Sequence, residues 1–284
     1  MKYNILLLAN NTYYKLLQIC IKSIVSVCDM DKIDKIFIAD LGLQNEHLGF
    51  LNTICDKIEI FDAKVKIGNS KKVFSSEWID SVSQKTVILR TLIESNRVPI
   101  IMLDSDTVII EDFSKVIETK YDIQICKRST PMLRKDNFVL EHIASFFIAN
   151  SSNATIFLSD WINRLEERIK LNLMPPHETP AMIETLQNNT NNNLNIGFLD
   201  ENVVSCENNY IKDVTKIIHA KSRNPRDHIS IYRFANIKNL PYYKIIKLFN
   251  NGRERILFSL AFFLKRLFQV HDLKKMIKKT ILRK

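Results

Sequence analysis

An apolar run that ends in two aspartates constrains this chain more than any other feature. Residues 98–103 (VPIIML) are too few and too apolar for anything but a buried strand, and Asp104 and Asp106 follow directly. Alternation along an extended chain sends both carboxylates to one face, where they can bind one divalent cation. The alternative is a turn at the strand end with two solvated aspartates.

Strands and helices alternate in the sequence before this pair. Strand-like runs lie at residues 4–9, 35–39, 57–61 and 98–103, and helical patterns lie near 13–27, 44–54 and 84–95. This alternation predicts a largely parallel sheet with crossover helices. Open sheets of this kind bind ligands where the carboxyl ends of the strands meet a crevice, and Asp104 and Asp106 lie at such an end.

The rhythm changes after Thr107, and the second half reads as α+β. Short strands are predicted at 121–126 and 143–149, and a helix is predicted at about 152–170. The polar, basic residues 127–137 and the asparagine-rich residues 187–195 are predicted to be loops, the first of them mobile. With five glycines and neither GxGxxG nor GxxxxGK[ST], a glycine-rich phosphate loop is excluded.

A histidine late in the chain is the second candidate for metal binding. His219 ends a short apolar run and precedes a basic stretch that contains Lys221. A neutral imidazole suits a Mn²⁺-like ion, and the adjacent cations are able to neutralise phosphate. A structural histidine is the alternative, and the aspartate pair earlier in the chain favours the ligand.

Taken in order, these features resemble the GT-A fold glycosyltransferases. The resemblance rests on residues 8–13 (LANNTY), Lys22-Ser23 after one helix, Asp104-Ser105-Asp106, and His219 with Lys221, and it covers about residues 3–225. It points in particular to the retaining nucleotide-sugar transferases of glycosyltransferase family 8, which include bacterial lipooligosaccharide galactosyltransferases. It implies an α/β, Rossmann-like nucleotide-diphospho-sugar transferase fold.

The resemblance also implies a domain plan and a set of site residues. The catalytic domain would span residues 1–235, with a nucleotide-binding half at about 1–110 and an acceptor half at about 111–235. Asp104, Asp106 and His219 would bind the metal. The nucleotide and its diphosphate would contact Ala9, Asn10, Thr12, Tyr13, Lys85, Arg90, Ser105 and Lys221. The chain departs from the family in having Asn10 where an aspartate is usual, and in lacking Gly-Lys-Pro after the histidine.

Two further segments are candidates for the sugar pocket. His177 and Glu178 fall where the family places a polar pair beside the sugar, so Glu178 would face the anomeric carbon or the acceptor hydroxyl. Alternatively, Glu178 is a helix-starting residue favoured by the helix dipole. Ser145 and Asn150 either line the pocket or belong to a strand explained by core packing.

The net charge of +10 resides in the C-terminal tail. Residues 236–284 hold thirteen Lys/Arg against two acidic residues, which leaves 28 basic and 29 acidic residues before them. The apolar run at 256–264 is shorter than the roughly 20 residues that span a bilayer. Its phenylalanines beside basic clusters favour amphipathic helices on an anionic membrane over nucleic-acid binding, so no nucleic acid partner is expected.

The resemblance implies a glycosyltransferase that depends on Mn²⁺ or Mg²⁺. By the resemblance, it would move a sugar from a UDP-sugar, with retention, to a glycan or lipid-linked acceptor in surface polysaccharide or lipooligosaccharide synthesis. The five cysteines form no disulfide or zinc pattern, and a cytoplasmic location on the inner face of the membrane is expected. The alternatives are a haloacid dehalogenase-type phosphohydrolase with Asp104 as nucleophile, and a non-enzymatic membrane or nucleic-acid adaptor.

Overall fold

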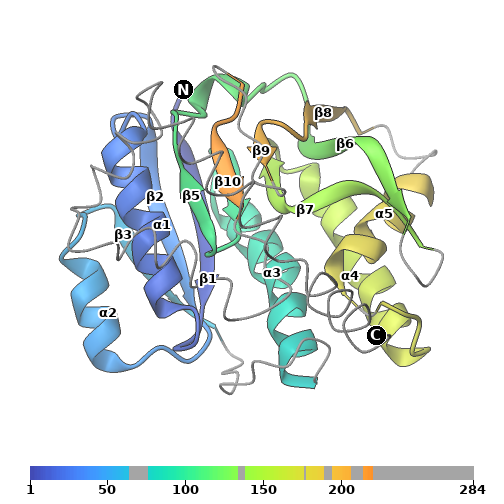
Figure 1. Cartoon of the computed structure of the whole chain (residues 1–284), viewed down its shortest axis with the longest axis horizontal. Helices are drawn as coiled ribbons and strands as arrows, with labels where there is room; N and C mark the ends of the chain where they lie inside the picture. Colours follow the sequence, from blue (N-terminus) through green and yellow to red (C-terminus); the bar gives the residue numbers. More distant parts are fainter. Residues whose placement is uncertain (64–75, 134–137, 176, 189–193, 206–213, 220–284) are drawn as a thin grey trace, which may run out of the picture.

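A computed structural model describes residues 1–63, 76–133, 138–175, 177–188, 194–205 and 214–219 of the chain. Within this part, a seven-stranded sheet has the order β3-β2-β1-β4-β7-β6-β8, and a smaller sheet has the order β5-β10-β9. Helices cover the large sheet on both faces (Figure 1). The predicted α/β fold with a largely parallel sheet is confirmed.

The first half is the parallel part of the large sheet. Its elements are β1 (Tyr3–Ala9), α1 (Tyr14–Val27), β2 (Ile33–Asp40), α2 (Asn45–Asn52), β3 (Ile58–Asp62), α3 (Ser76–Ser95) and β4 (Ile100–Leu103). β1 is buried along its whole length and pairs in parallel with β2 and β4, and β2 pairs in parallel with β3. Burial on both faces favours apolar side chains, so β4 and residues 5–9 of β1 are unbroken apolar runs. The exception is the buried Asn4, whose Oδ1 accepts the Lys35 amide at 3.0 Å.

The second half adds antiparallel strands and two more helices. Its elements are β5 (Thr107–Ile109), the 3₁₀ turn η1 (Ser114–Val116), β6 (Ile123–Leu133), β7 (Val139–Ala149), α4 (Ala154–Lys170), α5 (Glu178–Asn188), β8 (Ile196–Asp200), β9 (Val204–Ser205) and β10 (Ile217–His219). β7 is antiparallel to both β4 and β6, and β8 is parallel to β6. No helix in the described residues is both long enough and apolar enough to cross a membrane.

The prediction of a mobile loop at residues 127–137 is wrong for its first part. β6 continues to Leu133 and pairs with β7, because a partner strand satisfies the backbone whatever the side chains are. Lys127 also has an apolar support, since its ammonium lies 5.6 Å from the centre of the Phe198 ring. Residues 134–137 of that loop, and 189–193 of the asparagine-rich loop, lie outside the described residues, and α5 includes 187 and 188.

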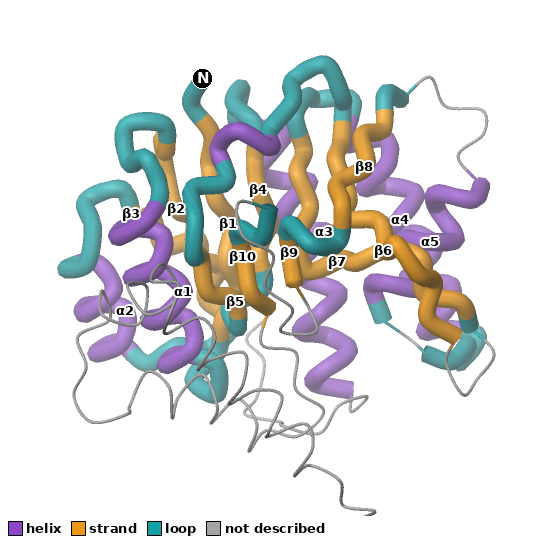
Figure 2. The backbone as a smooth tube through the Cα atoms, turned by 45° about the horizontal axis from the view of Figure 1, so that its top comes forward, coloured by secondary structure: helices purple, strands orange, loops and turns teal. Residues whose placement is uncertain are grey.

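The sheet separates two hydrophobic cores. On one face, α1, α2 and the small sheet pack against the strands, and on the other face α3, α4 and α5 do so (Figure 2). The second core contains an aromatic group in which Phe147 lies 5.4 Å from Trp161 between ring centres. Aromatic side chains bury large apolar areas, so this group anchors α4 to β7.

The strand order places β1 between β2 and β4. The chain moves outward from β1 to β2 and β3, and then returns to place β4 on the other side of β1. The carboxyl ends of β1 and β4 therefore lie side by side where the strand order reverses, and ligands bind at such a switch point in open parallel sheets. Ala9 and Leu103 end these two strands.

Two glycines test the packing of this fold. A Cβ added to Gly197 in β8 would lie 2.4 Å from Cδ2 and 2.7 Å from Cγ of Tyr121, so we expect Gly197→Ala to lower the free energy of unfolding by about 1–3 kcal/mol. Gly49 in α2 has no atom within 4 Å of that position, and Gly49→Ala should raise stability by about 0.5–1 kcal/mol. Urea denaturation measures both. Equal effects of the two changes would contradict the packing of Tyr121 on β8.

Candidate active site

The aspartate pair lies in a tight connection between the two sheets. β4 ends at Leu103 and β5 begins at Thr107, so Asp104-Ser105-Asp106 carries the chain from one sheet to the other. The Asp104 amide donates to the Ser145 carbonyl at 3.1 Å, and the Thr107 hydroxyl donates to the Asp104 carbonyl at 2.8 Å. The Ser105 hydroxyl donates to the Leu8 carbonyl of β1. These bonds fix the connection against its neighbours.

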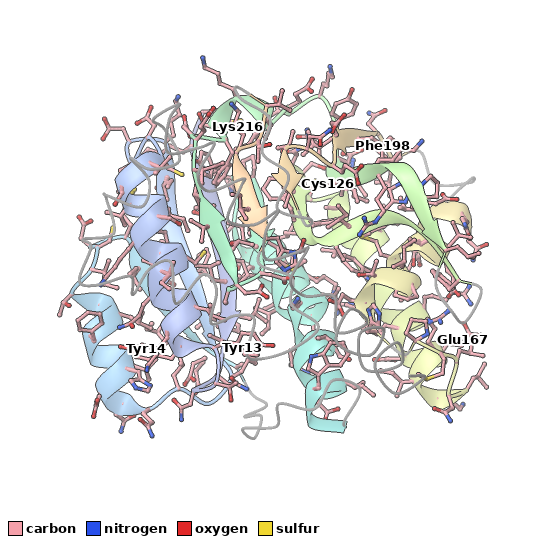
Figure 3. The ribbon with its side chains drawn as sticks, viewed as in Figure 1. Tyr13, Tyr14, Cys126, Glu167, Phe198 and Lys216 are labelled. Carbon is pink, nitrogen blue, oxygen red and sulfur yellow. The ribbon has the colours of Figure 1, made fainter. Side chains whose placement is uncertain are left out.

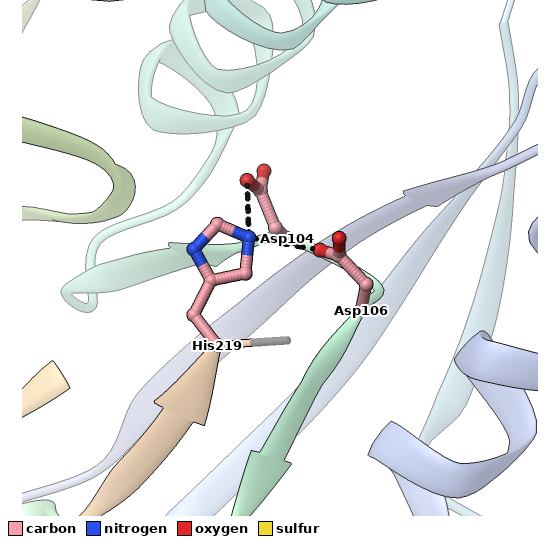
Figure 4. A group of neighbouring side chains, drawn as sticks. All are labelled: Asp104, Asp106 and His219. Carbon is pink, nitrogen blue, oxygen red and sulfur yellow. Dashed lines mark ion pairs between the residues drawn. The ribbon is translucent and has the colours of Figure 1, made fainter. Parts of the chain in front are cut away.

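Pairing within the small sheet brings His219 to the aspartates. β10 is antiparallel to β5, and His219 lies opposite Thr107. Its Nε2 is 3.1 Å from Oδ1 of Asp106 and 3.4 Å from Oδ2 of Asp104 (Figure 4). β5 is itself held by α1, because the Ile109 amide donates to the Ser23 hydroxyl at 3.0 Å.

Asp104, Asp106 and His219 form a donor set that fits a divalent cation. One ligand atom from each lies within 4.8 Å of the others, and the imidazole is buried while the carboxylates are partly exposed. Two carboxylate oxygens and one imidazole nitrogen suit Mn²⁺ or a similar ion, with the remaining positions open to a substrate. The predicted metal residues are therefore in contact with one another.

Lys85 lies between two carboxylates in the same site. On α3, its ammonium is hydrogen-bonded to Oδ1 of Asp104 and lies 3.5 Å from Oε1 of Glu178. Burial alone would lower the pKa of Lys85, but the charges of Asp104 and Glu178 outweigh it and raise that pKa. Burial would likewise raise the pKa of Glu178, but Lys85 and His177 hold it well below its usual range. Both groups are thus charged at neutral pH.

Glu178 is the first residue of α5, and two buried side chains of α4 fix its position. The Trp161 indole Nε1 donates to the Glu178 carbonyl at 2.8 Å. The Arg168 guanidinium donates to the Pro175 carbonyl at 3.3 Å and forms an ion pair with Glu184 on α5. An arginine offers five N–H donors in a rigid fork, so it is suited to tie a loop to a helix.

His177 is held next to Glu178. Its Nδ1 lies 3.6 Å from Oε2 of Glu178, and it accepts the Thr179 amide at 3.4 Å. The Trp78 ring meets the His177 imidazole edge to face, with 5.9 Å between ring centres. The two predicted catalytic residues therefore belong to the same cluster as Lys85.

The turn after β1 brings Tyr13 towards the aspartates. Oδ1 of Asn10 accepts the amides of Thr12 at 3.0 Å and Tyr13 at 3.3 Å, which closes the turn before α1. Tyr13 is labelled in Figure 3. Burial, followed by the charges of Asp106 and Asp104, raises the pKa of Tyr13 to about 12, so the phenol is neutral. The side chain of Ala9 is buried in the core, which leaves its backbone for any contact with a nucleotide.

The structure gives three of the predicted residues other partners. Arg90 turns away to α4, where it lies 3.4 Å from the Ser159 hydroxyl, and it also lies 3.5 Å from Glu94. The Ser105 hydroxyl is occupied by β1. The side-chain amide of Asn150 donates to Oε1 of Gln124 at 3.1 Å and to the Glu118 carbonyl at 3.2 Å, so it supports the loop that precedes β6.

Ser145 and Lys221 differ from these three residues, each for a different reason. The Ser145 hydroxyl is buried with no hydrogen-bond partner in the described part of the chain, beside the Asp104 connection. A bulge in β7 accounts for its position, because Ile125 pairs with Phe147 whereas the next residue, Cys126, pairs with Ile143. Lys221 lies outside the described residues.

The chain belongs to the nucleotide-diphospho-sugar transferase family, whose model matches residues 53–227. Among solved structures, it is similar to the bifunctional glycosyltransferase WbbM, with 14% identity and a TM-score of 0.54 over 87% of this chain and 51% of that chain. It is also similar to the glycosyltransferase GlyE of Streptococcus pneumoniae, with 10% identity and a TM-score of 0.58 over 89% of this chain and 64% of that chain.

A third similar structure is matched over almost its whole length. The galactosyltransferase LgtC, in complex with donor and acceptor sugar analogs, has 12% identity and a TM-score of 0.52 over 84% of this chain and 97% of that chain. The chain spans about half of WbbM and less than two thirds of GlyE. Identities this low show a shared fold. No curated protein sequence matches the chain.

Fold and family together make this chain a member of the nucleotide-diphospho-sugar transferase family with a GT-A-like fold. The predicted resemblance is confirmed by the family match. The match favours the nucleotide-sugar transferase interpretation over a haloacid dehalogenase-type phosphohydrolase. The aspartate motif also follows the fourth strand of the sheet, whereas the phosphohydrolase interpretation expects it near the start of its domain.

Removal of the buried ammonium tests the electrostatics of the site. Lys85→Met leaves Glu178 and Asp104 without their cation, so we expect the free energy of unfolding at pH 7 to fall by about 3 kcal/mol. Because the wild-type pKa of Glu178 is lowered, the stability from its pairing is present above the ordinary carboxyl pKa and is lost as pH falls through the folded value.

In Lys85→Met, burial instead raises the pKa of Glu178, so the folded variant takes up a proton before the unfolded chain does. The variant therefore gains stability relative to wild type as the pH falls from 7 to about 4.5. Urea denaturation across this range measures the difference. Lys85→Arg keeps the positive charge and is the matched control. A loss of stability in Lys85→Met that is the same at both pH values would argue against a charged Glu178.

Proposed function

We propose that this protein transfers a sugar from a UDP-sugar to a glycan or lipid-linked acceptor, with retention of anomeric configuration, in surface polysaccharide or lipooligosaccharide synthesis. A Mn²⁺ or Mg²⁺ ion held by Asp104, Asp106 and His219 would serve the reaction. One observation carries the proposal: these side chains, from two distant parts of the sequence, meet at the carboxyl end of β4 beside β1. Ligands bind at that place in open parallel sheets.

Two kinds of positive charge would act on the diphosphate. A bound cation supplies positive charge where the leaving diphosphate becomes more negative. Lys85 adds a second, fixed charge, since its ammonium is buried beside Asp104 and is protonated at neutral pH. Preorganised charges of this kind favour the transition state because they need no reorientation as the bond breaks.

Glu178 would act on the sugar as a fixed negative charge. Its lowered pKa makes it a poor proton acceptor at neutral pH, so general base catalysis is disfavoured. A carboxylate beside the anomeric carbon stabilises the positive charge that develops there as the glycosyl–phosphate bond breaks. His177 and Lys85 hold this carboxylate in place. Tyr13 and the Asn10 turn would contact the nucleoside, as the family resemblance implies.

Titration calorimetry with UDP tests the metal site. We expect wild type to bind UDP at least about tenfold more tightly with Mn²⁺ than without it, because a cation held by Asp104, Asp106 and His219 would offset the negative charge of the diphosphate. Asp104→Asn and His219→Ala should lose this difference. Glu178→Gln is the matched control, because it should bind UDP and Mn²⁺ like wild type while transferring or hydrolysing the sugar at least about 100-fold more slowly.

Metal-independent UDP binding in wild type would contradict the metal role of the triad. Turnover of p-nitrophenyl phosphate with Mg²⁺, lost in Asp104→Asn, would instead support phosphohydrolase chemistry. The anomeric proton of the first-formed product, followed by NMR, distinguishes retention from inversion.

We also propose that the protein is peripherally associated with the inner face of the cytoplasmic membrane through residues 236–284. These residues lie outside the described part of the chain, and the proposal rests on their sequence. Thirteen Lys/Arg against two acidic residues give this tail a charge of +11, interleaved with apolar and aromatic residues. Such a composition favours anionic lipid headgroups.

Replacement of four lysines tests the tail. The variant carrying Lys274→Gln, Lys275→Gln, Lys278→Gln and Lys279→Gln should bind anionic vesicles at least about tenfold more weakly at low salt, because each basic residue near the surface contributes about 1 kcal/mol. Vesicle sedimentation measures this. UDP binding should be unchanged, and vesicle binding equal to that of wild type would refute a role for these lysines.

A further inference from the structure

Exposed apolar side chains gather at one place on the described surface. Twelve large hydrophobic residues are exposed in the described part of the chain, and six of them lie in two short segments. Their exposed fractions range from 37% for Ile169 to 66% for Leu133. We call these six the apolar patch: Leu133, Val139, Ile169, Leu171, Leu173 and Met174.

The two segments of the apolar patch are adjacent in space. Leu133 and Val139 are paired across β6 and β7 at the free end of that hairpin. The Arg168 guanidinium lies 5.3 Å from the centre of the Phe138 ring, next to Val139. Both views place the hairpin end beside α4 and α5 (Figures 1 and 2).

Arg168 also fixes the second segment. Its Nη2 donates to the Met174 carbonyl at 3.0 Å and to the Leu173 carbonyl at 3.4 Å, and the guanidinium is buried. To fold Leu173 or Met174 back onto the protein, the backbone would have to give up these bonds to a buried charge. The patch is therefore presented to solvent by a constrained backbone.

The character of the patch suits a lipid surface better than a protein partner. All six side chains are aliphatic or thioether, whereas protein interfaces are enriched in aromatic residues and arginine. Six residues are also far fewer than the roughly 20–30 a side of a stable protein interface. Lys170 is exposed between Ile169 and Leu171, where its ammonium is able to meet a lipid phosphate.

We propose that the apolar patch inserts into the interface of an anionic membrane as a second attachment, separate from the tail. Met174 lies four residues before Glu178, so a protein docked by this patch would bring the start of α5 close to the lipid surface. The proposal rests on the proposed function, in which the acceptor is lipid-linked, and it names the surface that meets that acceptor. Phospholipid headgroups and acyl chains are the ligand.

Vesicle sedimentation with the full-length protein tests this at two salt concentrations. The vesicles contain phosphatidylcholine and phosphatidylglycerol. Binding through the basic tail is screened at about 0.5 M NaCl, whereas apolar insertion is not. At this salt, the double variant Leu171→Gln, Leu173→Gln should bind at least about tenfold more weakly than wild type. The matched control Phe50→Gln, Ile156→Gln changes two exposed apolar residues elsewhere and should bind like wild type.

Two results would overturn the proposal. One is equal binding of the patch variant and the matched control at high salt. The other is a wild-type dimer that the patch variant converts to monomer in light scattering, because it would assign the patch to a second copy of the chain. If Leu171→Gln, Leu173→Gln does not fold, Leu133→Gln, Val139→Gln tests the same patch from the hairpin.

UDP binding separates this proposal from the proposed function. Both double variants should bind UDP with Mn²⁺ like wild type, since none of the changed residues contacts the site. If wild type fails to bind UDP while vesicle binding follows the expected pattern, the proposed function fails and the membrane surface stands.

Discussion

The pairing of β10 with β5 is the interaction on which the site depends. It sets His219 opposite Thr107, immediately after the aspartate connection, and so brings together parts of the chain separated by more than a hundred residues. Side chains alternate between the faces of a strand, so a slip of one residue would turn the imidazole away from both carboxylates. The main-chain bonds that fix Asp104, and the contact of β5 with α1, keep this register.

A second constraint is the alternation of charge inside the site. From His219 through Asp104 and Lys85 to Glu178, each group faces a partner that is able to carry the opposite charge. Buried charges are costly when unpaired, so this order allows four ionisable groups to share one partly closed space. In the proposed function it would also separate two tasks, because the aspartates would bind the cation and Glu178 would face the sugar.

Much of this arrangement can be predicted from sequence, and the failures have physical causes. The strands β1 to β4 and the aspartate connection can be predicted from short segments of the sequence, because each strand is a mainly apolar run that is followed by polar residues. The partner of His219 is not local, and the family resemblance was needed to connect it with Asp104. The order of residues along the chain predicts nucleotide contacts for Arg90 and Ser105, but it does not predict their hydrogen bonds to Ser159 and to the Leu8 carbonyl. Residues 127–133 look like a loop only while the partner strand β7 is ignored.

Helix α4 supplies none of the site's charged groups, yet it governs one of them. The Trp161 indole and the Arg168 guanidinium of α4 donate hydrogen bonds to the chain at and just before the start of α5. Amino-acid changes on the inner side of α4 would therefore be recorded as defects in turnover, although they touch neither sugar nor metal. A survey of variants that measured only activity would therefore assign too many residues to the active site. A parallel measurement of stability would identify the α4 residues that act on turnover only through the fold.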